Sequence, residues 1–338
     1  MWKSLAATAT VAFALVNPNP TLGVAQDAPV SQKSVPEQIV DAFNGVFGVH
    51  PGARATHAKG VLLKGTFTPS ASATSVSKAA HLQKKKTPVP STFRFSASTG
   101  LPAISDTDPG ASPRGMAVKF DLPDGSKTDI VANSFNGFPV ATAAELRDLF
   151  LAIAATKPED PQPTALDQFL SSHPSAKAFL EAPKPAPVSY ATLVYFGVNA
   201  FKFTNAKGAA TFGRYRLQPV AGEQFVTKEQ LSAMGPDYLT TEIRERVRRG
   251  PVKFKLFLQV AAQDDKIDDP SIAWPEARKK IELGTLTITN AVADSQTAEK
   301  KLLFMPGTLV PGIEAADPMI AARSAAYIVS LSRRAQTQ

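Results

Sequence analysis

The chain has 338 residues, of which 43% are hydrophobic and 20% charged, an ordinary globular composition with enough length for a sizeable core. It contains no cysteine, so disulfides, thiolate catalysis and cysteine-ligated zinc or iron–sulfur sites are excluded. The net charge of +8 favours anionic small molecules or surfaces by long-range attraction, but the basic residues are too scattered to indicate nucleic-acid binding.

The first 25 residues differ in composition from the rest. Lys3 is their only charge, residues 5–16 form an apolar run, and Gly23-Val24-Ala25 places small residues where a signal peptidase would cut. This three-part pattern is typical of a secretory leader; the alternative is a buried N-terminal helix, which the prolines at 18 and 20 would end abruptly. We therefore expect an exported protein, periplasmic or secreted, with residues 26–338 as its single domain. No later run is long enough to span a membrane.

The first predicted helix covers residues 35–47. Ser34 followed by Glu37 fits a capping box, Pro36 suits the first turn and Gly48 suits the end. One face of this helix is apolar and should pack on a core. That face carries Ile39, Phe43, Val46 and Phe47.

Two groups of four strands are predicted from alternating apolar residues between turn signals. The first group is 60–67, 93–97, 116–122 and 129–132, and the second is 193–203, 209–218, 254–261 and 283–289. A helical stretch over 143–180 separates them. Because the helices are inserted between groups of strands, we expect an α+β fold: an eight-stranded antiparallel β-barrel with inserted and C-terminal helices.

The clearest predicted helix is the C-terminal one. Asp317 can cap its start, and Arg333 and Arg334 suit its negative end. Arg323 and Tyr327 are four residues apart, so their side chains are neighbours. A guanidinium beside the phenol oxygen and an iron(III) ion both favour the phenolate. Considered alone, the helix favours a simpler interpretation, a core tyrosine near a surface arginine.

Six segments, in order along the chain, resemble the haem catalase family. They are Arg54-Ala55-Thr56-His57-Ala58-Lys59-Gly60, Phe93-Arg94-Phe95-Ser96, residues 113–125, residues 190–215, Pro311-Gly312-Ile313-Glu314, and Arg323-Ser324-Ala325-Ala326-Tyr327. His-Ala-Lys-Gly is a weak motif alone, whereas six motifs in the right order form a strong signal. The similarity runs from about residue 40 to residue 334.

The resemblance implies a haem site, with haem b as the cofactor. Tyr327 would be the protein ligand of the iron, with Arg323 beside it. His57 would handle the peroxide proton, and Ser96 would orient its ring. The propionates would meet arginines, and phenylalanines would pack on the haem ring. These residues are Arg54, Arg94 and Arg334, together with Phe138 and Phe150.

The chain also departs from the family pattern. Catalases place the distal asparagine in an Asn-Asn-Thr-Pro stretch, and here Asn133 and Asn136 compete for that role. Asn136 is slightly favoured, although an ungapped alignment would place Ser134 there. Thr56 stands where catalases usually have valine, as in the related allene oxide synthases. Ile328-Val329, rather than Pro-Asp, follows the tyrosine.

We therefore expect a haem-dependent peroxidase that reduces hydrogen peroxide with a small organic reductant and has weak catalase activity. The chain ends soon after the tyrosine helix, a pattern found in small catalase-related peroxidases, and a shorter chain should expose the haem to larger donors. The alternatives are a true catalase, a fatty-acid hydroperoxide-converting enzyme suggested by Thr56, and a non-catalytic haem-binding protein. The last would need an axial ligand but not His57 with Ser96.

Overall fold

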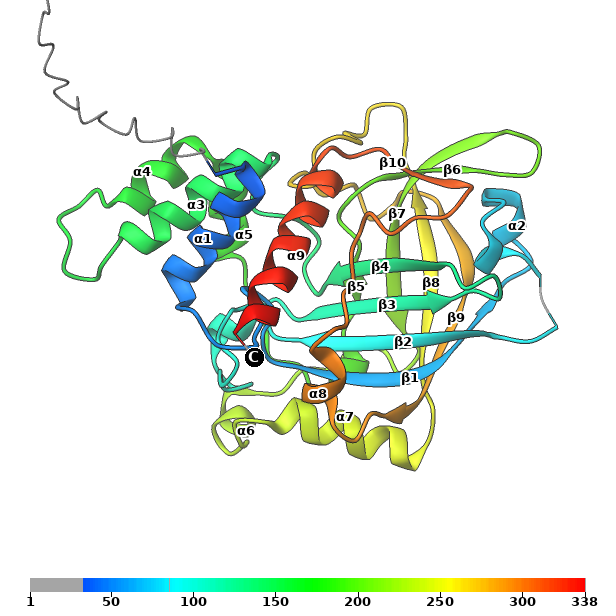
Figure 1. The fold of residues 1–338 in the computed structure, drawn as a ribbon, viewed down its shortest axis with the longest axis horizontal. Coiled ribbons are helices and arrows are strands. Elements are labelled where there is room, and N and C mark those ends of the chain that lie inside the picture. The colour runs from blue at the N-terminus through cyan, green and yellow to red at the C-terminus, as the bar shows by residue number, and fades with distance from the viewer. Residues whose placement is uncertain (1–32, 85, 338) are drawn as a thin grey trace, which may run out of the picture. The chain divides into compact units, whose positions relative to one another are not determined.

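The central element of the fold is an antiparallel sheet that closes on itself (Figure 1). The computed structural model describes residues 33–84 and 86–337, so the predicted leader over residues 1–25 lies outside the described residues. Within the described ranges the strands pair in the order β1-β2-β3-β4-β5-β7-β8-β9, and β9 pairs back with β1. The eight-stranded antiparallel barrel predicted from the sequence is therefore confirmed. Closure leaves these strands without an open edge.

The barrel strands range from two residues in β5 to twelve in β9. Their bounds are β1 Gly60–Pro69, β2 Val89–Ser96, β3 Gly115–Asp121, β4 Lys127–Asn133, β5 Tyr195–Phe196, β7 Ala210–Pro219, β8 Val252–Val260 and β9 Lys280–Ala291. Two further strands, β6 Phe201–Thr204 and β10 Ile313–Ala315, extend the sheet beyond β7.

One predicted strand is wrong in its extent. The strand expected over 193–203 is divided into β5 and β6, with an irregular segment between them. The break has a tertiary cause, because Asn199 in that segment is buried and donates a hydrogen bond to Asp317, 118 residues further along. An alternating apolar pattern in the sequence cannot indicate such a long-range contact.

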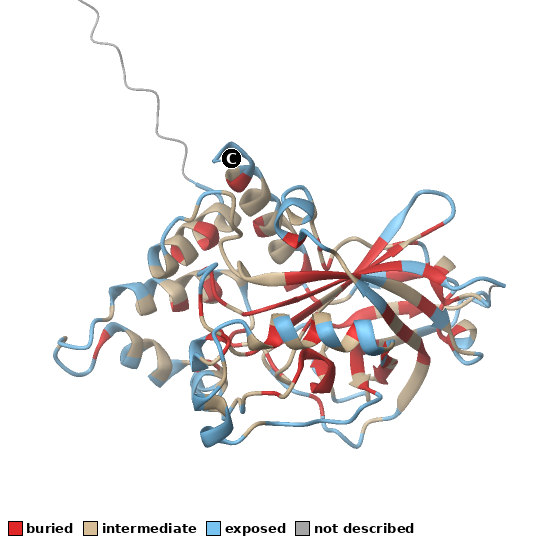
Figure 2. Cartoon of the chain, turned by 90° about the horizontal axis from the view of Figure 1, so that it is seen from below, coloured by how far each residue is buried: buried red, intermediate tan, exposed pale blue. Residues whose placement is uncertain are grey.

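Aromatic side chains fill the interior of the barrel. Phe95 on β2 stacks on Tyr190 with ring centroids 5.1 Å apart, and its ring lies 6.2 Å from that of Phe254 on β8. Many of the buried residues lie on the strands (Figure 2). Successive side chains on a strand point to opposite faces, so Arg94 and Ser96 point away from the interior that Phe95 fills. The candidate site therefore lies on the outer wall of the barrel.

Helices cover that outer wall. Their bounds are α1 Val35–Phe47, α2 Ala73–Val76, α3 Ala143–Ala155, α4 Ala165–Ser172, α5 Pro174–Glu181, α6 Lys228–Ser232, α7 Tyr238–Arg249, α8 Ser295–Glu299 and α9 Met319–Gln336. The predicted bounds of α1 and its capping box are confirmed. The stretch predicted as helical over 143–180 is three helices, because a proline-rich loop and Pro174 interrupt it.

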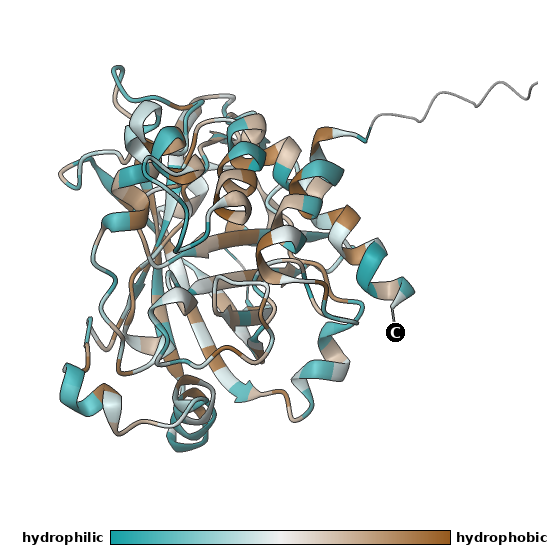
Figure 3. Cartoon of the chain, turned by 90° about the vertical axis from the view of Figure 1, so that its left-hand side faces the viewer, coloured by the Kyte–Doolittle hydropathy of each residue, from teal (hydrophilic) through white to brown (hydrophobic). Residues whose placement is uncertain are grey.

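A second apolar cluster joins these helices to one another. Ile39 and Val40 of α1, Leu146 and Leu149 of α3, and Ala326 of α9 are buried in it. Seen from the helical side, hydrophilic and hydrophobic residues alternate along the helices, as expected for one buried and one solvated face (Figure 3). Within the described ranges, no helix has the length and apolar character needed to cross a membrane.

Candidate active site

Two adjoining cavities lie between the barrel wall and helices α1 and α9. Their volumes are about 80 Å³ and about 550 Å³, and the larger is within the range of ordinary ligand pockets. His57, which precedes β1, and Tyr327, on α9, each line both cavities. The structure thus brings together two residues that are 270 positions apart in the chain, as the sequence predicted.

His57 is held in an unusual backbone conformation. Its φ is +55°, and among the described residues it is the one residue other than glycine with a positive φ. Such a conformation costs about 1–3 kcal/mol and persists where surrounding contacts enforce it. Its Nδ1 lies 3.0 Å from Ser96 Oγ. Gly115 on β3 leaves room for this pair, since a Cβ there would lie 2.6 Å from Ser96 Oγ and 3.0 Å from His57 Nδ1.

The surroundings of His57 keep its imidazole neutral. Burial lowers the pKa of His57 to about 3, and the positive charges of Arg94 and Arg323 contribute to the decrease. A neutral imidazole has one N–H and one lone pair. With the proton on Nδ1, donated to Ser96 Oγ, Nε2 is left able to accept a proton. His57 is therefore available as a base over the whole neutral and mildly acidic range.

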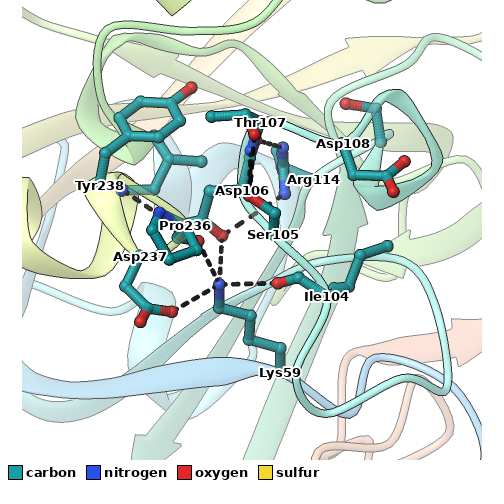
Figure 4. A network of polar contacts seen from close by, with 12 residues as sticks. Lys59, Ile104, Ser105, Asp106, Thr107, Asp108, Arg114, Pro236, Asp237 and Tyr238 are labelled. Carbon is teal, nitrogen blue, oxygen red and sulfur yellow. Dashed lines mark hydrogen bonds and ion pairs between the residues drawn. The ribbon is translucent and has the colours of Figure 1, made fainter. Parts of the chain in front are cut away.

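The segment carrying His57 is fixed by a polar network (Figure 4). Two residues beyond His57, the Lys59 ammonium group lies between the carboxylates of Asp106, at 3.0 Å, and Asp237, at 2.7 Å. It also donates to the carbonyls of Ile104 and Pro236, at 2.8 Å each. Asp106 is fully buried, so this ion pair is poorly screened by solvent. These contacts anchor the histidine segment to α7.

Tyr327 is positioned by a chain of hydrogen bonds along α9. Arg323 donates to Tyr327 Oη at 2.9 Å and, through its other terminal nitrogen, to Asn199 Oδ1. Asn199 in turn donates to Asp317 at 2.7 Å. Asp317 accepts a bond from the Met319 N–H at 2.8 Å. The helix begins at Met319 with Pro318 in the cap position, so Asp317 lies one residue before the cap that the sequence predicted for it. Asn199 was not identified from the sequence, because nothing in its local pattern separates it from a strand residue.

Three arginines gather on one side of the smaller cavity, and two of them share a single carboxylate. Arg94 donates to Glu299 at 2.6 Å, and Arg54 lies 3.7 Å from the same oxygen. Arg54 and Arg334 both donate to the Leu302 carbonyl, at 3.0 Å and 2.9 Å. Burial together with neighbouring guanidinium groups lowers the pKa of Arg54 and of Arg334, the latter to about 10. Glu299 was not identified from the sequence either.

This arginine cluster, Arg54, Arg94 and Arg334, contains more positive charge than its surroundings balance. Arg334 is 4% exposed, and its Nε is buried without a hydrogen-bond partner. Such groups are costly unless an anion meets them. The two carboxylates of haem are groups of the required charge, so the arginine cluster fits the cofactor that the sequence predicts.

The predicted ring-packing residues both line the larger cavity. The Phe138 ring centroid lies 5.4 Å from the Arg323 guanidinium carbon. Phe150 packs edge-on against Phe43 of α1, with ring centroids 4.5 Å apart. Aromatic and aliphatic walls of this kind suit a planar, apolar ring.

The two candidate asparagines occupy different places. Asn133, the last residue of β4, lines the larger cavity, and its Oδ1 accepts a bond from the Phe135 N–H at 2.7 Å. Asn136 lies outside both cavities and donates to Glu276 at 3.1 Å. Ser134 is also engaged elsewhere, accepting from the Arg114 N–H at 2.9 Å. Of the three, Asn133 is the one placed to meet a ligand, and the slight preference for Asn136 is not supported.

Comparison with known proteins identifies the family to which the chain is similar. Residues 51–337 match the catalase family. The chain is 38% identical over 303 residues to a catalase-related peroxidase of Mycolicibacterium paratuberculosis, covering 88% of this chain and 94% of that protein. It is 32% identical over 329 residues to a catalase-related peroxidase of Synechococcus elongatus, covering 96% of each chain.

Two solved structures share the fold. A fungal catalase matches with a TM-score of 0.74 and 21% identity, covering 84% of this chain and 60% of its own. Catalase A from Saccharomyces cerevisiae matches with a TM-score of 0.74 and 20% identity, covering 84% and 62%. The chain therefore spans about 60% of the length of these structures.

The lowered pKa of His57 makes folding of the haem-free protein sensitive to acid. In the unfolded chain the pKa of His57 is near 6.5, so on acidification the unfolded chain binds a proton at a higher pH than the folded protein does. The contribution of His57 to stability is therefore present above about pH 6.5 and is lost as the pH falls. Between pH 7 and pH 5 the free energy of unfolding should fall by about 2 kcal/mol more than in His57→Gln. Urea unfolding of both proteins at pH 7 and at pH 5 measures this difference. An equal decrease in the free energy of unfolding for the two proteins would contradict a neutral imidazole in the folded state.

Proposed function

The chain belongs to the catalase family, and on that premise we propose that it is a haem-dependent peroxidase that reduces hydrogen peroxide with an organic electron donor. One observation carries the proposal: His57 with its Ser96 partner and Tyr327 with its Arg323 partner line the same cavities. A protein that merely carried haem would need Tyr327 but would have no use for a base held in a strained conformation.

Haem b is the cofactor that we propose for this site. When bound, haem supplies the redox centre that stores the two oxidising equivalents of peroxide until a donor reduces it. Tyr327 would bind the iron through its phenol oxygen, with the Arg323 guanidinium supporting negative charge on that oxygen. Arg54, Arg94 and Arg334 would bind the two propionates, which gives the partnerless Arg334 Nε an acceptor.

His57 performs the proton transfer that peroxide cleavage requires. Its Nε2 takes the proton from one peroxide oxygen and returns it to the other, which then leaves as water. The Ser96 bond to Nδ1 keeps the ring orientation constant while this happens. Asn133 is placed to donate an amide N–H to peroxide in the same cavity.

Access to the cavity favours an organic donor over a second peroxide molecule. The larger cavity reaches Leu101 and Leu180, which are 37% and 39% exposed, so it extends from His57 to the surface. Its 550 Å³ exceed what peroxide needs. We therefore propose that catalase activity is weak.

A lipid hydroperoxide rearrangement, the alternative suggested by Thr56, has less support. The Thr56 hydroxyl is already engaged, because it donates to the Ser98 carbonyl at 2.6 Å.

We also propose that the protein is exported. The proposal rests on the composition of residues 1–25, with one charge, an apolar run and small residues at its end. The mature protein, isolated from its native cell envelope or medium, should begin near residue 26. An intact Met1 in that material would contradict export by this leader.

Removing the base tests the function most directly. His57→Ala should retain haem but react with hydrogen peroxide about 10²-fold more slowly or worse, because acid–base assistance contributes on that scale. Stopped-flow absorption of the haem-loaded protein measures the rate. Thr56→Val is the matched control, since it changes the adjacent residue of the same cavity wall and should stay within about threefold of the parent. A parent-like rate for His57→Ala would remove His57 from the mechanism.

Removing the phenol oxygen tests cofactor binding. Tyr327→Phe should lose the haem absorption of the purified protein or shift it strongly, because its ring remains but its iron ligand does not. Tyr190→Phe, which changes a fully buried tyrosine inside the barrel, should leave that spectrum unchanged. An unaltered spectrum in Tyr327→Phe would show that another residue binds the iron.

A further inference from the structure

A third cavity borders the arginine cluster from another side. It measures about 730 Å³ and is formed by the segment before β1, the first part of α7, the region of α8 and the end of α9. We call it the polar side cavity. α7 and α8 and the end of α9 gather in the lower part of Figure 1. Arg54 and Arg334 line both this cavity and the smaller of the two cavities that contain His57 and Tyr327.

The lining of the polar side cavity contrasts with that of the large cavity. The large cavity is lined by six phenylalanines, and the polar side cavity by none. Its basic lining residues are Arg54, Lys59, Arg244, Lys300 and Arg334. Its acidic lining residues are Asp237, Asp294 and Glu299. A lining of this kind favours a hydrophilic molecule over an apolar aromatic one. Because Arg54 and Arg334 are assigned to the propionates and Lys59 is paired, Arg244 and Lys300 are the basic lining residues left to attract a further anion.

The contacts show which of these positive charges are still uncompensated. Lys59 is neutralised by Asp106 and Asp237 (Figure 4). Arg244, by contrast, donates to two neutral acceptors, the Val292 carbonyl at 2.9 Å and Ser295 Oγ at 3.0 Å. Among the described residues no carboxylate lies within 4.0 Å of a charged nitrogen of Arg244 or of the exposed Lys300, although Lys300 interacts at longer range with the Asp294 carboxylate. Arg244 is therefore uncompensated and Lys300 partly compensated, and together they can attract an anion.

Arg334 and Glu299 mark the side of the polar side cavity that faces the arginine cluster. The partnerless Arg334 Nε is the atom assigned above to a propionate, so it indicates where the haem edge would lie. If haem propionates fill the inner side of the arginine cluster, the polar side cavity ends at the edge of the haem. An electron donor bound there would be close to the redox centre without entering the space that peroxide uses.

We propose that the polar side cavity binds the electron donor, and that the donor is a small hydrophilic organic anion of the ascorbate class, an oxidisable enediol. This inference rests on the proposed peroxidase function. Each donor monoanion gives up one electron and one proton, so two of them convert one hydrogen peroxide into two water molecules and become two radical anions. Because donor and peroxide occupy different cavities, they do not compete for binding.

The test compares two neighbouring lysines in the haem-loaded protein. Lys300 lines the polar side cavity, whereas Lys301 is equally exposed and does not. Lys300→Glu should raise the KM for ascorbate about fivefold, because a reversed charge at the cavity repels the monoanion. Lys301→Glu changes the net charge equally and should stay within about twofold of the parent. The KM for guaiacol, a neutral phenol, should be unchanged in both, and 0.5 M salt should reduce the ascorbate difference.

A binding measurement without peroxide separates the site from the activity. Ferric haem should broaden the proton NMR lines of ascorbate in the parent and in Lys301→Glu, and much less in Lys300→Glu. Equal broadening and equal KM values for the two variants would overturn the donor site while leaving the peroxidase function intact. Absence of peroxide-dependent oxidation of any donor would overturn the peroxidase function, and with it the donor role of the cavity.

Discussion

Four guanidinium groups border the two adjoining cavities, and among the described residues a single carboxylate, that of Glu299, forms ion pairs with the arginine cluster, contacting Arg54 and Arg94 but not Arg334. Charges of one sign are costly to bury together unless anions offset them. Burial, and after it the neighbouring guanidinium groups, lowers the pKa values of Arg54, Arg334 and His57. The buried positive charge thus connects cofactor binding with the neutrality of the base.

The fold brings these charges together from distant parts of the chain. Closure of the barrel places Arg94 and Ser96 on the outer wall, and α9 brings Arg323, Tyr327 and Arg334 to face it. His57 tolerates its backbone strain because the Ser96 contact, the absence of a Cβ at residue 115 and the nearby Lys59 network restrain it. The site therefore depends on packing among the barrel wall, α9 and the segment held by Lys59. Loosening any one of these would free His57 from its strained conformation.

Features with a local signature could be predicted from the sequence. The first helix, most barrel strands and the existence of α9 follow from periodicity, capping residues and turns, and the ordered motifs pointed to His57, Tyr327 and the arginines. Features set by tertiary contacts could not. The interruption between β5 and β6 depends on the Asn199–Asp317 bond, and Glu299 joins the arginine cluster only through folding. The choice between Asn133 and Asn136 depends on where β4 ends, which no local pattern specifies.

The central claim is that a haem iron binds at Tyr327 in the cavity that His57 also lines. X-ray diffraction from crystals of the haem-loaded protein, recorded on both sides of the iron absorption edge, locates the iron without reference to activity. We predict a single anomalous peak within bonding distance of Tyr327 Oη, about 2 Å, in the space lined by His57. A peak away from Tyr327, or an iron bound by His57 itself, would contradict the account.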